Sequence, residues 1–123
     1  MQDNDPFVTH QIKSFSHAFK GIIYSFKVGF HFKVQVLVLA LVVILGFIYT
    51  ISTFEWLTIV LISSAVIAAE TFNTAIEETC NLLHPEIHPH ARLAKHCAAG
   101  AVLIFSIAAL IVAALIFLPK VLS

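Results

Sequence analysis

The sequence predicts an all-α polytopic membrane protein, with an N-terminal amphipathic surface helix followed by three transmembrane helices. Hydrophobic residues make up 59 % of the 123 residues, and the mean hydropathy is +0.95. Three apolar segments are long enough to cross a bilayer, which takes about 20 helical residues. The length supports a single domain. A net charge of zero gives no support for nucleic-acid binding.

The N-terminal region divides into two segments. Residues 1–13 are expected to be a disordered N-terminus, because the chain begins with a polar stretch. Residues 14–32 are expected to form the surface helix, since apolar residues recur there at helical spacing among lysines. Such a helix lies in the membrane interface, and its lysines reach toward lipid phosphates. Residues 14–119 then form one membrane domain.

The predicted transmembrane helices cover residues 34–51, 54–83 and 93–118. The first contains Gln35 as its only strongly polar residue, and the third is expected to end at Pro119. The second is longer than a bilayer requires, so its polar end can reach the interface. Two prolines in the turn between the second and third spans predict a helix break.

Positive charge is distributed unevenly between the two ends of the predicted bundle. Four lysines lie in the N-terminal arm, and Arg92 and Lys95 lie beside the turn between the last two spans. The opposite side carries only Lys120. The positive-inside rule then places the N-terminus and this turn on the cytoplasmic side of the inner membrane. A site at this turn faces the compartment that holds nucleotides.

A polar stripe in the second span is the strongest functional signal. Glu70, Asn73 and Glu77 are spaced so that they share one helix face, and Asn81 follows one turn later. Ionisable groups at membrane depth are costly and usually mark a functional site. The alternative interpretation is that the two carboxylates only hold neighbouring helices together.

The stripe fits a site that transfers a phosphoryl group to a lipid hydroxyl. Such a site needs a carboxylate base, a carboxylate ligand for Mg²⁺, groups that contact phosphate, and exclusion of water. Glu70 is the candidate base and Glu77 the candidate metal ligand. Asn73 and Lys95 are the candidate phosphate contacts. Lys95 taken alone also fits an interfacial lysine that extends toward the lipid headgroups.

Three stretches carry a resemblance to a known family. They are Glu70-Thr-Phe-Asn73-Thr-Ala-Ile-Glu77, Pro85-Glu86-Ile87-His88-Pro89 and Ala94-Lys95-His96-Cys97-Ala98-Ala99-Gly100. With them the chain resembles the prokaryotic diacylglycerol kinase and undecaprenol kinase family from about residue 14 to residue 119. Phe19-Lys20-Gly21 belongs to the same similarity, which adds Lys20 to the phosphate-binding candidates.

The resemblance implies an integral membrane lipid kinase. Its expected properties are a homotrimer of three-helix subunits, active sites shared between neighbouring subunits, and MgATP as the phosphoryl donor. The expected substrate is a membrane lipid alcohol, either undecaprenol or diacylglycerol. The short loop around Glu86 and His88 looks more like that of the Gram-positive undecaprenol kinases.

The chain departs from the family pattern at three polar positions. Gly29 and His96 stand where the family has acidic residues, and Asn81 replaces an aspartate one turn beyond the stripe. These changes remove about three negative charges from a site that has to hold Mg²⁺. The interpretations left open are a lipid kinase with an altered metal site, a divergent member without kinase activity, and a lipid-binding structural trimer.

Histidines and cysteines near the second turn suggest another chemistry. Cys80 and His84 are four residues apart, close to Glu77, which is a workable spacing for Zn²⁺. A site of Glu77, His84 and His96 would activate a metal-bound water. The protein would then be a metal-dependent lipid phosphatase.

Overall fold

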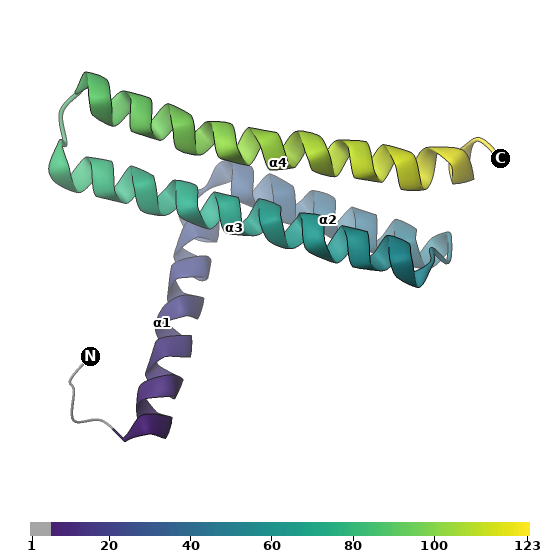
Figure 1. The fold of residues 1–123 in the computed structure, drawn as a ribbon, viewed down its shortest axis with the longest axis horizontal. Coiled ribbons are helices and arrows are strands. Elements are labelled where there is room, and N and C mark those ends of the chain that lie inside the picture. The colour runs from purple at the N-terminus through teal and green to yellow at the C-terminus, as the bar shows by residue number, and fades with distance from the viewer. Residues whose placement is uncertain (1–5) are drawn as a thin grey trace.

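The computed structural model describes residues 6–123, and this part of the chain is helical apart from short connections. The helices are α1 (Phe7–Val28), α2 (Phe30–Ile48), α3 (Thr53–Leu83) and α4 (Pro89–Val121). Figure 1 shows α2, α3 and α4 side by side, with α1 leaving them at a steep angle. Helices α2, α3 and α4 are each long and apolar enough to cross a membrane. The predicted fold class, a surface helix plus three spans, is confirmed.

The expected disorder of residues 1–13 is wrong from Phe7 onward, because α1 begins there. The N–H of His10 donates to the carbonyl of Pro6 at 2.9 Å, which closes the first helical turn. Proline suits a helix start because its missing N–H would have no intrahelical partner there. Residues 1–5 lie outside the described part of the chain.

Gly29 separates the surface helix from the first span. Its backbone is extended, with φ −95° and ψ 108°, and α1 therefore ends at Val28 rather than near residue 32. The N–H of Gly29 donates to the carbonyl of Ser25 at 3.0 Å. A Cβ at this position would lie 2.8 Å from that same carbonyl oxygen, so a larger residue requires the backbone to shift. The bend lets α2 begin at Phe30, four residues before the predicted start at 34.

The end of the bundle away from α1 is held by an ion pair. Ser52 and Glu55 form a reciprocal capping box at the start of α3. Glu55 also accepts a hydrogen bond from Lys120 of α4 at 2.9 Å. The Lys120 ammonium also donates to the carbonyl of Ile116 at 3.2 Å, inside the last turns of α4. The third span consequently runs through Pro119 to Val121 instead of ending at the proline.

At the opposite end, α3 and α4 extend beyond the start of α2, and the surface helix lies in that region (Figure 1). The 31 residues of α3 span about 46 Å, against about 30 Å for the hydrocarbon core of a bilayer. A helix of this length can therefore place its last turns outside the hydrocarbon core. This is the segment that carries Glu77 and Asn81.

Replacing Gly46 with alanine is expected to weaken the contact between α2 and α3. Gly46 is buried, and an added Cβ would lie 2.5 Å from the Trp56 ring. Overpacking of this kind lowers the free energy of unfolding by about 1–3 kcal/mol. Thermal unfolding in detergent measures the loss. The matched control is Gly100→Ala, where the new methyl group meets nothing within 4 Å; equal melting of the two variants would contradict the prediction.

Candidate functional site

Glu70 is buried in α3 with only 4 % of its surface exposed. Within the described residues, its Oε1 atom has no hydrogen-bond partner, and neither does the buried Oδ1 atom of Asn73. Buried polar oxygens are almost always paired, and unpaired ones need a specific explanation. Two such acceptors within one helical turn mark this part of α3 as the candidate site.

The polar stripe leads from the buried part of α3 to its exposed end. Asn73 donates from Nδ2 to Oε1 of Glu77 at 3.3 Å, and Glu77 is exposed. This bond orients the Glu77 carboxylate and leaves its second oxygen available. The predicted helical register of Glu70, Asn73 and Glu77 is thus the one observed, although no contact tests their roles.

Lys95 joins α4 to the outer end of the stripe. Its ammonium donates to Oδ1 of Asn81 at 2.8 Å. The partner is a neutral carboxamide at the position where the family resemblance predicts an aspartate. The full positive charge of Lys95 therefore remains available to an anionic ligand.

The turn between α3 and α4 forms a cationic cavity of about 250 Å³. Lys95 and Arg92 line it, and the rings of His84 and His88 stack beside it with centroids 4.4 Å apart. His96 also lines this cavity. The carboxylate of Glu86 also lines the cavity, but the two permanent positive charges outnumber it, and with the three imidazoles they make the cavity suited to an anion such as a chain of phosphates.

The surface helix is tied to the same end of α3. The hydroxyl of Tyr24 donates to Oε1 of Glu78 at 2.8 Å. This hydrogen bond raises the pKa of Tyr24 above its ordinary value, so the tyrosine stays protonated at neutral pH. Lys20 lies one helical turn before Tyr24 on the same face of α1. Among residues 6–123, Lys20 makes no hydrogen bond or ion pair that tests its predicted contact with phosphate.

The zinc alternative gains no support from the arrangement of its ligands. Among residues 6–123, no three histidine, cysteine, aspartate or glutamate side chains are close enough to hold a metal ion. Glu77, His84 and His96 are consequently not brought together in one chain. Cys80 is buried, and its thiol faces the carbonyl of Ala91 at 3.7 Å.

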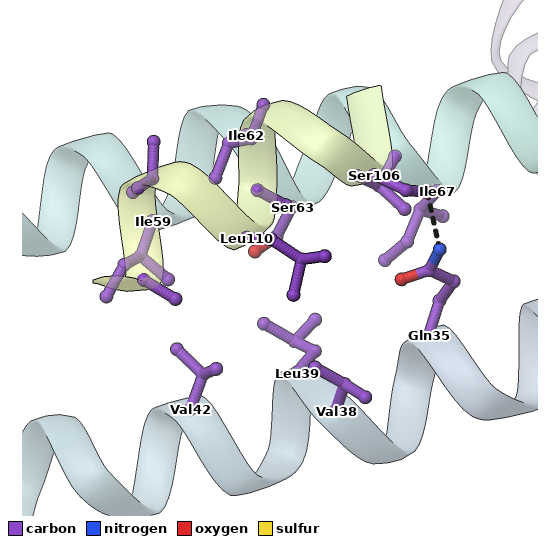
Figure 2. Close-up of a pocket in the computed structure, with 14 residues that line it drawn as sticks. Gln35, Val38, Leu39, Val42, Ile59, Ile62, Ser63, Ile67, Ser106 and Leu110 are labelled. Carbon is purple, nitrogen blue, oxygen red and sulfur yellow. Dashed lines mark hydrogen bonds between the residues drawn. The ribbon is translucent and has the colours of Figure 1, made fainter. Parts of the chain in front are cut away.

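A second, apolar cavity of about 180 Å³ lies between α2, α3 and α4, and sequence reasoning missed it (Figure 2). At one end of the cavity, Gln35 donates to the hydroxyl of Ser106 at 2.6 Å. The sequence feature that could have indicated this cavity is Gln35, the single strongly polar residue of the first span. On α3 the cavity is lined from Ile59 to Ile67, and Glu70 follows Ile67 on the same helix face.

Residues 16–117 match the sequence profile of a protein family described as prokaryotic diacylglycerol kinase. The chain belongs to this family. It is 40 % identical over 108 residues to the undecaprenol kinase of Bacillus subtilis (strain 168), an alignment covering 88 % of each chain. It is 33 % identical over 111 residues to the diacylglycerol kinase of Synechocystis sp. (strain ATCC 27184 / PCC 6803 / Kazusa), covering 89 % of this chain and 63 % of that one.

The match confirms the family that the three stretches at residues 70–77, 85–89 and 94–100 predict. It also confirms that the chain is an enzyme of a lipid kinase family, with a multi-pass membrane fold. The three departures from the family pattern have separate positions in this structure. Gly29 forms the bend, Asn81 is the partner of Lys95, and His96 lines the cationic cavity.

Proposed function

We propose that this chain transfers the γ-phosphoryl group of MgATP to the hydroxyl group of a membrane lipid alcohol. The observation that carries the proposal is the buried, unpartnered carboxylate oxygen of Glu70. On α3 this residue lies between the lining of an apolar cavity and a polar stripe that leads out of the span. The apolar cavity suits the hydrocarbon chain of a lipid, and the polar stripe suits a nucleotide.

Each side chain has a separate task in this reaction. Glu70 accepts the proton of the lipid hydroxyl as that oxygen attacks phosphorus. Lys95 stabilises the negative charge on the phosphate oxygens, because its partner Asn81 is neutral. Asn73 holds Glu77 in place and can contact phosphate. The apolar surroundings of Glu70 keep water from competing with the lipid hydroxyl.

The donor set at the outer stripe fits Mg²⁺ better than a softer metal. Glu77 offers a hard carboxylate oxygen, and Mg²⁺ in phosphoryl-transfer sites is held by one or two carboxylates together with substrate phosphates and water. When bound, the ion neutralises charge on the phosphate oxygens. Glu77 would hold it on the polar stripe, two turns of α3 before the cationic cavity begins at His84.

Replacing Glu77 with glutamine is expected to raise the Mg²⁺ concentration needed for half-maximal transfer by at least about tenfold, since the variant loses the charged ligand. Asn73 can still hydrogen-bond to the new carboxamide, so the helix is preserved. A Mg²⁺ titration of the transfer rate gives the result. An unchanged Mg²⁺ dependence would remove Glu77 from the metal site.

We propose undecaprenol as the preferred substrate. The apolar cavity of about 180 Å³, which lies one helical turn from Glu70 along α3, has room for a segment of a hydrocarbon chain. The relative from Bacillus subtilis, which is 40 % identical, is named an undecaprenol kinase. Diacylglycerol is the second candidate, since the relative from Synechocystis bears that name.

We further infer that the reaction occurs on the cytoplasmic face of the inner membrane, in a homotrimer. The lysines of α1 and the cationic turn at the same end of the bundle support that orientation. Exposure of Glu77 on the isolated chain supports a site completed by a neighbouring subunit. Chemical cross-linking in native membranes, read as the largest linked species, tests the trimer.

A comparison of nucleotide-dependent and nucleotide-independent reactions tests the proposed function. Protein in lipid nanodiscs is given MgATP with undecaprenol or diacylglycerol, and the phosphorylated lipid is quantified. Faster product formation from undecaprenol is expected. Release of phosphate from undecaprenyl phosphate without nucleotide, blocked by a chelator, would instead indicate the phosphatase.

A further inference from the structure

His88 starts α4 with both its backbone and its side chain, at the turn that joins α3 to α4 (Figure 1). Its carbonyl accepts a hydrogen bond from the N–H of Arg92 at 2.9 Å, which closes the first turn of the helix. Its ring atom Nδ1 accepts a second one from the N–H of His90 at 3.2 Å. The first N–H groups of a helix have no intrahelical partner, and a side chain that accepts from one of them acts as an N-cap. The imidazole of His88 has this role in α4.

The capping hydrogen bond defines the protonation state of the His88 ring. A backbone N–H can only donate, so Nδ1 has to supply a lone pair and carries no proton. The neutral imidazole then holds its proton on Nε2. An imidazolium has an N–H at both positions and cannot accept. The cap of α4 therefore exists only while His88 is neutral.

The surroundings of His88 oppose a positive charge on its ring. The ring is half-buried, and that of His84, which follows the last residue of α3, stacks on it with centroids 4.4 Å apart. The ring of His90 lies 5.7 Å away on α4. The ionisable side chains that share the cationic cavity with His88 come from this turn and from α4, and they are His84, Glu86, Arg92, Lys95 and His96. Glu86 is the one acidic residue among them.

We propose that His88 is a positioning residue for the nucleotide site, whose neutral ring caps α4 and thereby fixes the two turns that carry Arg92 and Lys95. Imidazole takes up its proton between about pH 8 and pH 5. The cap stabilises the start of α4 at the upper end of this range, and it is lost as the pH falls. The contact of Lys95 with phosphate rests on the proposed function, whereas the cap does not.

Amide hydrogen exchange of the whole protein in lipid nanodiscs tests the cap without a kinase assay. Mass spectrometry follows the segment 88–96, and variants are compared at the same pH because the intrinsic exchange rate changes with pH. Asparagine caps a helix well and does not titrate, whereas alanine caps poorly. The wild type is expected to match His88→Asn at about pH 8 and His88→Ala at about pH 5, with about a fivefold loss of protection relative to His88→Asn.

His90→Gln is the matched control for these variants. It removes a neighbouring imidazole and keeps the backbone N–H that donates to Nδ1 of His88. The wild-type pH dependence of protection is expected to persist in it. Equal protection of the wild type and His88→Asn across the pH range would overturn the cap. Should thermal unfolding show that His88→Asn is misfolded, convergence of the wild type onto His88→Ala at low pH decides the same question.

The KM for MgATP is the second readout, and it connects the cap to nucleotide binding. On acidification, the KM of the wild type is expected to rise by up to about fivefold relative to that of His88→Asn. The other imidazoles of the cavity are the same in both proteins, so their protonation cancels in this ratio.

The direction of the KM ratio separates positioning from direct contact. A ratio that falls on acidification would show that the protonated ring of His88 itself binds phosphate, and a constant ratio would show that the cap does not affect the nucleotide site. Either result would overturn the positioning role. A pH-dependent cap in a protein that transfers no phosphate would sustain the cap and refute the proposed function.

Discussion

Replacing Glu70 with glutamine is expected to lower kcat for lipid phosphorylation by about 10²–10⁴-fold, which is the contribution of a positioned general base. Glutamine has nearly the same shape and no charge, so the buried site is not emptied. The KM for MgATP is expected to change little, because Glu70 lies at the buried end of the polar stripe. Initial rates over a range of ATP concentrations in nanodiscs separate the two parameters.

Glu78→Gln is the matched control for Glu70→Gln. It changes another glutamate of α3, which is exposed, and Tyr24 can still donate to the carboxamide oxygen. Its kcat is expected to stay close to that of the wild type. Equal kcat values for Glu70→Gln and the wild type would show that the base is another residue.

Replacing Lys95 with methionine is expected to act mainly on nucleotide binding. Methionine retains most of the length of the side chain and removes its charge. Hydrogen bonds to charged groups contribute about 1.5–3 kcal/mol, so the KM for MgATP should rise by about 10–150-fold. Isothermal titration with a non-hydrolysable ATP analogue measures the same loss as a change in Kd.

Asn81→Ala shows whether the effect comes from the charge or from the link between α3 and α4. This variant removes the acceptor of the 2.8 Å bond and leaves the Lys95 ammonium in place. A much smaller rise in KM than that of Lys95→Met is expected. If the two variants weaken nucleotide binding equally, Lys95 acts by joining the helices rather than by contacting phosphate.

Most of the fold could be predicted from the sequence, because hydropathy along a helix is a local property. The predicted second span, 54–83, differs from α3 by one residue at its start. The errors lie where single backbone features decide a boundary. Pro6 begins α1 earlier than expected, and Gly29 ends it earlier by taking an extended conformation. Neither feature changes the hydropathy pattern.

The candidate site could be predicted only as far as one helix extends. The spacing of Glu70, Asn73 and Glu77 follows from helical periodicity, and it is retained in α3. The bond between Lys95 and Asn81 and the bond between Gln35 and Ser106 depend on how neighbouring helices are rotated and aligned. Such information is tertiary, and periodicity within each segment does not contain it.

Transfer of radiolabelled phosphate from the γ position of MgATP into extractable lipid tests the central claim most directly. Wild-type protein in nanodiscs containing undecaprenol is predicted to place the label on the lipid, at a rate that falls to background in Glu70→Gln. Failure of folded wild-type protein to label either undecaprenol or diacylglycerol would contradict the proposed kinase reaction.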